Sequence, residues 1–494
     1  MMKKITTLLL LAAMLSASHL TACGEGDITT SGETGTEAVG TEAPVETEAV
    51  DLRQLVSDDL PEKDYSGRTF RMMLRQSYEY EFDVKEADGD TMNDAVYHRN
   101  LRIAERYGVA FETTAVSAVW NEGVFNKAIS TSVTAGDNAY ELVCGYMCDI
   151  TPTITQGLYI NWYDIPHINL EKPWWSNLMT EAFTINDRIY MITGDLALSF
   201  WEMMNGVGFN KAVAAAHDLE DMYTVVDEGR WTMDYLETVS KDISKDLNGD
   251  SVWDKTDMYA WASNFSTGID ALKEAFGLSI VVKDENGIPQ FSVTTDKTVE
   301  VLERVGAFFK NHSGFMAEGN MDADAHNMFI EDRALFLALT MGTVSKLRDM
   351  NTDFGLIPYP KWDETQEAYG STVQDGATVF LVPQTIDDPE FVGIITEAMA
   401  AESYKTVVPA YYDVVLKTKS SRDEESARMI DLIRDTVKID FGYIHSTALN
   451  GAGHLFVNQV REGTSNIASA FKSIEKGAQK KLDEIVEFYY RDGE

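Results

Sequence analysis

The most specific pattern of oxygen-bearing residues in the sequence is the loop 246–257, which reads DLNGDSVWDKTD. Side-chain oxygens stand at loop positions 1, 3, 5, 9 and 12, and a main-chain carbonyl is available at position 7, the ligand spacing of an EF-hand calcium loop. The residues concerned are Asp246, Asn248, Asp250, Asp254 and Asp257, with the carbonyl from Val252. Ser251 stands where a glycine usually makes the turn, and Asp257 is shorter than the usual bidentate Glu. The spacing predicts a structural Ca²⁺ site, and the alternative is a solvated turn rich in Asp and Asn.

Two cysteines, Cys144 and Cys148, lie four residues apart. A metal or redox pair is conceivable, but this spacing without a second cluster of Cys or His is weak evidence for one. The apolar run that contains Cys144 has the character of a strand. We therefore predict buried thiols at the end of a strand.

Motifs of the common enzyme classes are missing from the sequence. There is no His-Glu-x-x-His zinc motif, no Gly-x-Ser-x-Gly elbow and no Gly-x4-Gly-Lys phosphate loop, and Gly206 and Gly208 lack the third glycine of a dinucleotide fingerprint. Carboxylate pairs have almost no specificity, because the chain carries 80 Asp and Glu. We expect no catalytic residues.

Aromatic residues are numerous, with 21 tyrosines and nine tryptophans. Flat aromatic faces match the C–H faces of sugar rings, and neighbouring Asp, Asn and Gln side chains can bind hydroxyl groups, so the collection suits a neutral saccharide. The alternative for any single Trp is a place in the core. The tryptophans are Trp120, Trp162, Trp174, Trp175, Trp201, Trp231, Trp253, Trp261 and Trp362.

Strand-like and helical patterns alternate along the chain. The strands and helices that they predict would position the aromatic and polar side chains named above. Strands are predicted at 68–75, 111–116 and 140–147, separated by helices that begin at Thr91 and Val124, and this order favours a parallel sheet covered by helices. Gly108 is a good left-handed cap for the first helix. Later signals are a helix capped by Thr232, a buried strand at 333–340, a helix opened by Asp388-Pro389 and a long final helix from Ile467 to Tyr489. About 430 residues of this pattern indicate two α/β lobes.

The charge of the chain excludes several classes of partner. With 80 acidic and 41 basic side chains, the formal charge is −39. Nucleic acids and anionic membrane surfaces are bound mainly through Lys and Arg, so neither is expected to bind. The 44% of hydrophobic residues is enough for a large core.

The N-terminus resembles an export signal. Lys3 and Lys4 precede a short apolar run, and Leu20-Thr-Ala-Cys23 resembles the bacterial lipobox, in which the cysteine is lipidated. We predict a signal peptide at 1–22, lipidation of Cys23, and an acidic disordered tether over 23–64, because this stretch is too poor in apolar residues at its start to build a core.

Taken in order, these features resemble the family 1 extracellular solute-binding proteins of bacterial ABC importers, of the maltose-binding type. The resemblance covers the chain from about Tyr65 to the end. Beside the lipobox and the acidic loop, it rests on the segments 190–195 (YMITGD), 208–211 (GFNK), 228–234 (EGRWTMD), 403–412 (SYKTVVPAYY) and 422–426 (RDEES).

The resemblance implies a type II fold of two α/β lobes, each a mixed sheet flanked by helices, with the chain crossing between them more than once. Carried onto this sequence, the crossings are expected near 193–195, 320–326 and 371–376. Lobe 1 would hold 65–193 and 325–371, and lobe 2 would hold 194–324 and 372–494.

The resemblance also implies a function and a site. The chain is expected to be a monomer, anchored by lipid outside the cell, that captures a solute, most naturally an oligosaccharide, and delivers it to an ABC permease. The alternatives are a membrane-tethered carbohydrate-active enzyme and an adhesin or structural lipoprotein. The expected ligand-binding residues flank strand ends and crossings: Tyr78, Trp120, Tyr146, Asp195, Trp201, Glu202, Gln374, Asp375, Tyr411 and Tyr412.

Overall fold

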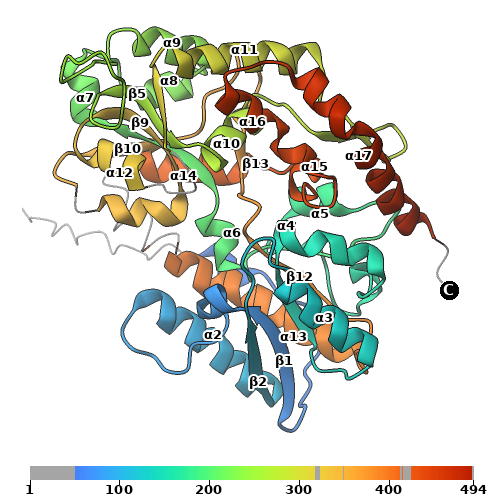
Figure 1. Ribbon diagram of the computed structural model, residues 1–494. Helices are drawn as coiled ribbons and strands as arrows, with labels where there is room; N and C mark the ends of the chain where they lie inside the picture. Colours follow the sequence, from blue (N-terminus) through green and yellow to red (C-terminus); the bar gives the residue numbers. More distant parts are fainter. Residues whose placement is uncertain (1–50, 318–322, 349, 412–413, 415–423, 492–494) are drawn as a thin grey trace, which may run out of the picture. The chain divides into compact units, whose positions relative to one another are not determined.

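The computed structural model describes residues 51–317, 323–348, 350–411, 414 and 424–491, and the chain from Leu52 to Glu494 forms one compact unit (Figure 1). The predicted signal peptide, Cys23 and most of the predicted tether lie outside the described residues. The last part of that tether is ordered against the core, which corrects the prediction. Val56 and Leu60 pack against core residues, and Asp58 accepts a hydrogen bond from Arg106. Within this last part, Asp58 forms an ion pair with Arg106, and Asp59 forms one with Lys172.

The first sheet has four strands in the order β12-β3-β1-β2. Strand β1 (Arg68–Arg75) is parallel to β2 (Val109–Val116) and to β3 (Leu142–Tyr146), whereas β12 (Thr378–Leu381) is antiparallel to β3. The register places Phe70 opposite Phe111. The three predicted strands and their parallel arrangement are confirmed.

Helices pack on this sheet as their sequences predict. Helix α2 (Thr91–Tyr107) ends at Gly108, which has a left-handed φ of 59°. A Cβ at Gly108 would lie 2.1 Å from a carboxylate oxygen of Asp64, so a larger residue would clash there. Helix α3 (Val124–Ala135) contacts β2, and α13 (Pro389–Glu402), capped by Asp388, contacts α2 (Figure 1). The shared core of the sheet and these helices fixes where the strands end.

The second sheet has five strands in the order β10-β4-β9-β5-β8. Its central strand, β9 (Ala334–Thr340), is antiparallel to β4 (Asn205–Asn210) and parallel to β5 (Tyr259–Asn264). The edge strands are β8 (Gly314–Ala317) and β10 (Phe354–Ile357). Six of the seven residues of β9 are buried, as its continuous apolar run predicts. The helices that accompany this sheet are α7 (Lys211–Ala216), α8 (Met222–Asp227), α9 (Met233–Ser240), α10 (Thr267–Ala275), α11 (Asp296–Lys310), α12 (Ala323–Ile330) and α14 (Glu424–Asp435).

The strand pairing corrects the predicted lobe boundaries. Strand β9 and strand β10 lie in the sheet of β4 and β5, so the segment 325–371 belongs with the second sheet. Strand β12 belongs to the first sheet, although the prediction grouped it with the second lobe. The apolar pattern of 333–340 shows that the strand is buried but carries no information about its partners.

Two of the three expected crossings agree with the pairing. The segment 193–204 leads from the first sheet to β4, and the segment 371–377 leads to β12. The expected crossing at 320–326, part of which lies outside the described residues, is wrong, because the strands before and after it, β8 and β9, both pair with β5. At the first crossing, a Cβ on Gly194 would lie 2.1 Å from the carbonyl oxygen of Trp174, so only glycine fits there.

The C-terminal helices complete the core. Helix α17 (Ile467–Tyr490) buries one stripe of apolar residues, as predicted, and contacts α16 (Leu455–Glu462), which in turn contacts α10 and α11 (Figure 1). The remaining elements are short: α4 (Met147–Ile150), α5 (Asn177–Phe183), α6 (Leu198–Glu202), α15 (Phe441–Ile444), the strand pairs β6 (Val281–Lys283) with β7 (Pro289–Phe291) and β11 (Ser371–Thr372) with β13 (Val437–Lys438), the 3-10 helices 52–55, 76–81, 151–156, 162–164, 341–347 and 452–454, and a π-helix at 403–407.

Candidate functional site

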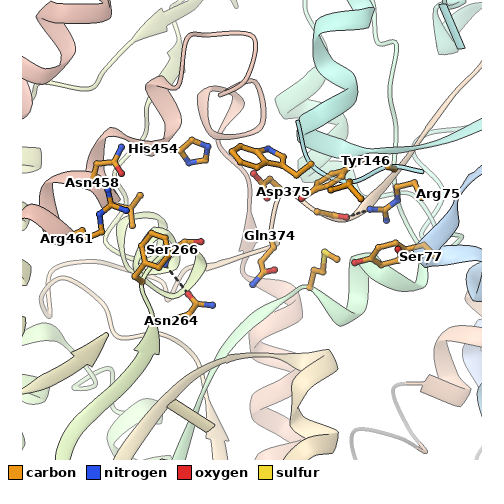
Figure 2. Close-up of a pocket in the computed structure, with 18 residues that line it drawn as sticks. Arg75, Ser77, Tyr146, Asn264, Ser266, Gln374, Asp375, His454, Asn458 and Arg461 are labelled. Carbon is orange, nitrogen blue, oxygen red and sulfur yellow. Dashed lines mark hydrogen bonds between the residues drawn. The ribbon is translucent and has the colours of Figure 1, made fainter. Parts of the chain in front are cut away.

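A cavity of about 570 Å³ lies where strand ends of both sheets meet helix α16. Its volume is in the range typical of small-molecule sites, about 300–1,000 Å³. Figure 2 shows that the residues labelled there come from several elements that are distant in sequence. The lining residues are Arg75, Ser77, Tyr78, Ala118, Val119, Trp120, Tyr146, Met203, Asn264, Phe265, Ser266, Gln374, Asp375, Gly376, His454, Val457, Asn458 and Arg461.

The end of β1 supplies a buried guanidinium to the cavity wall. Arg75 is the last residue of β1 and is 2% exposed. Its Nη1 donates to the carbonyl of Gly376 at 2.7 Å, and its Nη2 donates to the hydroxyl of Thr378 at 2.5 Å. Its guanidinium also lies over the ring of Tyr78, 3.7 Å from the centroid. These contacts hold Arg75 rigidly and fix the orientation of the Tyr78 ring beside it.

The segment between β11 and β12 forms the part of the wall that joins the two sheets. Gln374 donates its backbone N–H to the carbonyl of Met203 at 3.0 Å, and the carbonyl of Asp375 accepts from the backbone N–H of Cys148 at 3.1 Å. Burial raises the pKa of the Asp375 carboxyl to about 6, although a hydrogen bond from the Cys148 thiol lowers it in part. The cavity therefore contains a carboxylate that is mostly ionised at neutral pH.

Helix α16 presents one face to the cavity. His454, Val457, Asn458 and Arg461 follow the spacing i, i+3, i+4 and i+7, which places them on one side of a helix. Figure 2 shows His454, Asn458 and Arg461 across the cavity from Arg75 and Tyr146. Burial lowers the pKa of His454, and the charge of Lys273 lowers it further, so its imidazole is neutral at physiological pH.

The end of β5 supplies a turn of fixed geometry. The side-chain oxygen of Asn264 accepts backbone N–H groups from Ser266 at 3.2 Å and from Gly268 at 2.9 Å, which orders the start of α10. Phe265, between them, lies under Arg461, whose guanidinium carbon is 5.4 Å from the ring centroid.

The lining combines flat aromatic rings with groups that bind hydroxyls. The rings are those of Tyr78, Trp120, Tyr146 and Phe265, and Trp120 is 51% exposed. The amides of Asn264, Gln374 and Asn458 each offer donors and acceptors. This arrangement can bind a polyhydroxylated ring through one apolar face and several hydroxyls. Glycosidases use a pair of carboxylates, whereas the lining residues include the single carboxylate of Asp375.

Five of the predicted ligand-binding residues line the cavity: Tyr78, Trp120, Tyr146, Gln374 and Asp375. Asp195, Trp201, Glu202 and Tyr411 are absent from the lining, and Tyr412 lies outside the described residues. Asp195, Trp201 and Tyr411 are buried, and Glu202 accepts a hydrogen bond from Tyr80. Those four side chains are used inside the fold, so their predicted contact with ligand is not supported by the cavity.

The prediction missed the cavity residues that follow β5 and those on α16. The spacing of 454, 457, 458 and 461 is visible in the sequence, but the same pattern is found on any amphipathic helix. Most tryptophans follow the core interpretation. Those that are buried are Trp162, Trp174, Trp175, Trp201, Trp231, Trp261 and Trp362. Cys144 and Cys148 are buried, unpaired thiols, as predicted.

The loop 246–257 turns its carboxylates toward its own backbone. Asp246 accepts the N–H groups of Gly249 and Ser251, and the buried Asp257 accepts those of Leu247 and Asp254. Among the described residues, no three His, Cys, Asp or Glu side chains are placed to hold a metal ion. The observed bonds are those of the alternative, a turn rich in Asp and Asn. Calcium binding stays a prediction.

Calcium binding by this loop is checked by chelation. Each carboxylate oxygen that accepts one N–H keeps a second lone pair for a cation, so a site with a dissociation constant of about 10 μM in millimolar calcium would add roughly 2.7 kcal/mol to the free energy of unfolding. We expect a chelator to lower the melting temperature of the native protein and to leave Asp254→Ala unchanged. If the native protein melts at the same temperature with and without chelator, the calcium site is rejected and the loop is a turn rich in Asp and Asn.

Comparisons with known proteins define the class of fold. No family model matches the sequence, and no curated protein matches it. Solved structures do match over 84–86% of this chain. A cyclo/maltodextrin-binding protein complexed with maltotetraose is 12% identical, with a TM-score of 0.55 and 96% of that chain covered. An ABC substrate-binding protein from Listeria monocytogenes in complex with cycloalternan is 12% identical, with a TM-score of 0.52 and 100% covered.

A family 1 extracellular solute-binding protein from Bifidobacterium longum subsp. infantis is 11% identical, with a TM-score of 0.53 and 98% of that chain covered. This chain therefore has the two-lobe α/β fold of solute-binding proteins, and the predicted fold class is confirmed. At these identities the likeness is one of fold.

Proposed function

We propose that this protein is an extracellular solute-binding protein that captures a saccharide and delivers it to an ABC permease. The observation that carries the proposal is the 570 Å³ cavity, in which aromatic rings stand beside amide side chains, at the junction of the two sheets. Two solved structures with the same fold contain maltotetraose and cycloalternan, which supports a saccharide as the ligand here.

The elements around the cavity also suit a protein that closes on its ligand. In the first sheet, Tyr146 ends β3 and Tyr78 lies just after β1, whereas Phe265 follows β5 of the second sheet. A ligand that contacts both groups gains more interactions when they approach, so binding favours a closed state by hinge motion at the segments 193–204 and 371–377. In this proposal, the permease recognises the closed state.

The saccharide is tested by thermal denaturation with a panel of purified oligosaccharides. We expect a matching ligand to raise the melting temperature, to change tryptophan fluorescence and to reduce the radius of gyration in small-angle scattering. Trp120→Ala should weaken binding by roughly 1–3 kcal/mol, because an exposed ring in the cavity would lose its stacking partner. Tyr490→Ala, which removes an exposed ring at the end of α17, is the matched control and should bind normally.

Three results would contradict parts of this proposal. Normal affinity in Trp120→Ala would remove the stacking role of that ring but would leave the receptor intact. Release of free sugar from an oligosaccharide by the pure protein would favour the alternative, a tethered carbohydrate-active enzyme. A panel that gives no shift at all would favour an adhesin or structural lipoprotein.

Lipid anchoring through Cys23 and a monomeric state complete the proposal. The lipobox-like sequence at 20–23 supports the anchor, and no helix in the described part of the chain is long and apolar enough to cross a membrane. We expect Cys23→Ala to move the protein from the membrane fraction to the soluble fraction of exporting cells, because a multiply acylated cysteine binds firmly. Blotting of the two fractions checks this, and Cys23→Ala protein that stays in the membrane fraction would contradict the lipid anchor.

A further inference from the structure

The charges that line the cavity differ in sign from those of the rest of the molecule. The whole chain has about two acidic residues for each basic one. The cavity lining contains two arginines, Arg75 and Arg461, and one carboxylate, Asp375. A neutral saccharide does not require a positive charge in its site. Amides and hydroxyls can bind its hydroxyl groups without the desolvation cost of placing a cation in a cavity.

Arg461 has a charge that no described carboxylate balances. It is exposed on the cavity face of α16, and its guanidinium carbon lies 5.4 Å from the centroid of the Phe265 ring. Nine other arginines of the described chain form ion pairs with Asp or Glu. In a protein with such an excess of carboxylates, an arginine that faces a cavity and lacks one is available to an anion from solution.

Arg75 adds a second, buried cation across the cavity from Arg461 (Figure 2). Its two Nη atoms are bound by Gly376 and Thr378, and its Nε is buried without a hydrogen-bond partner. The carboxylate of Glu81 lies beyond the Thr378 hydroxyl and balances part of the charge from that side. The Nε donor remains unused.

We infer that the captured saccharide carries an anionic substituent, a carboxylate or a sulfate, that pairs with the guanidinium of Arg461. The inference rests on the proposed function and narrows its ligand class from saccharides to acidic saccharides. A planar guanidinium with paired N–H donors matches both a carboxylate and a sulfate, so geometry alone leaves the two substituents equivalent. The net charge of −39 does not oppose this pairing strongly, because charges beyond about 8 Å are screened at physiological ionic strength.

The test is titration calorimetry with matched pairs of oligosaccharides. Each pair has the same linkage and length and differs in the acidic group: oligogalacturonides against galacto-oligosaccharides, oligomannuronides against manno-oligosaccharides, glucuronate-substituted against unsubstituted xylo-oligosaccharides, and sulfated against unsulfated galacto-oligosaccharides. We expect one acidic member to bind about tenfold or more tightly than its neutral partner, as a charge-assisted hydrogen bond is strong enough to provide. The pair in which this occurs identifies the substituent as carboxylate or sulfate.

Two variants assign the effect to Arg461. Arg461→Gln should weaken the acidic ligand about tenfold and leave its neutral partner within about twofold, and Arg461→Glu should weaken the acidic ligand further. Arg461 is exposed, so the fold should tolerate both changes. Lys476→Gln, which removes the same charge from the exposed surface of α17, should change neither affinity.

The possible failures are distinguishable. A neutral oligosaccharide that binds as tightly as its acidic partner, or an acidic one that binds Arg461→Gln with unchanged affinity, would overturn this inference and leave the proposed receptor intact. Binding of no member of any pair would overturn the proposed saccharide receptor, and the inference with it.

Discussion

Glu81→Ala is expected to lower the free energy of unfolding by about 3–5 kcal/mol, the cost of leaving several buried polar groups without their partner. Glu81 ends the 3-10 helix after β1 and is 0% exposed. One carboxylate oxygen accepts the backbone N–H of Ser199 at 2.6 Å, and the other accepts the hydroxyl of Thr378 at 2.6 Å. Ser199 lies on the first crossing and Thr378 begins β12, so the carboxylate ties a crossing segment to the first sheet.

The Glu81→Ala substitution disturbs more of the structure than the two hydrogen bonds that Glu81 accepts. Thr378 also accepts from Arg75, and its backbone N–H donates to the hydroxyl of Ser199 at 2.9 Å. Removal of the carboxylate therefore leaves the N–H of Ser199 and the O–H of Thr378 without an acceptor, and it removes a carboxylate that shares the Thr378 hydroxyl with the buried Arg75. Groups in such a network stabilise one another, so the cost exceeds that of one surface ion pair.

Denaturant unfolding followed by tryptophan fluorescence measures the change. Glu86→Ala, which removes an exposed carboxylate a few residues away, is the matched control and should unfold with nearly native stability. Glu81→Gln keeps the shape and one acceptor oxygen but turns an amide N–H₂ toward a donor, so it should also be destabilised, by less than alanine. A loss below about 1 kcal/mol in Glu81→Ala would show that water replaces the carboxylate.

The local elements of this fold are predictable because their causes are local. A short apolar run defines β1, and the pairing of an N-terminal cap with a glycine stop defines α2. The assignment of strands to sheets is different. The apolar run of β9 shows that both its faces are buried, yet its neighbours β4 and β5 are fixed by contacts between segments far apart in the chain.

The residues of the candidate site that lie at strand ends were predictable, because the positions of strand ends have local causes. Tyr146 ends β3 and Tyr78 lies just after β1, and side chains at the ends of adjacent strands meet at one edge of the sheet. Asn458 and Arg461 could not be placed, since nothing in the sequence of α16 indicates which element its polar side chains face. Asp195 was predicted to line the cleft because it lies at the expected crossing 193–195, but the fold buries its side chain.

The burial of Asp195 has a consequence for stability. Its side chain is 7% exposed, and burial raises the pKa of its carboxyl to about 8, although the hydrogen bond from Trp201 lowers it in part, as do the charges of Arg53 and Arg434. In the unfolded chain, the carboxyl titrates near its ordinary pKa of 3.8. Between about pH 4 and pH 8, the folded protein thus holds a proton that the unfolded chain has released. Stability therefore falls as pH rises through this window and stops falling above about pH 8.

Asp195→Asn is expected to gain stability relative to the native protein as pH rises from 4 to 8, by up to about 1.4 kcal/mol for each pH unit. Asparagine keeps an oxygen that can accept from Trp201 and has no proton to lose. Other buried carboxyls with raised pKa values, such as Asp270 and Glu274, titrate in both proteins, so they cancel when the two free energies of unfolding are subtracted at each pH.

The measurement is urea unfolding of both proteins at intervals from pH 4.5 to pH 8. Between pH 4.5 and pH 7.5, the difference in the free energy of unfolding should shift by roughly 2–4 kcal/mol in favour of Asp195→Asn. The reason is that the folded native protein must either keep a proton that the unfolded chain has lost or hold a charged carboxylate in a buried site. Asp164→Asn, which removes an exposed carboxylate, is the matched control. A flat difference for Asp195→Asn would mean that the native carboxylate is ionised throughout, and that the fold stabilises its charge through Trp201 and the charges of Arg53 and Arg434.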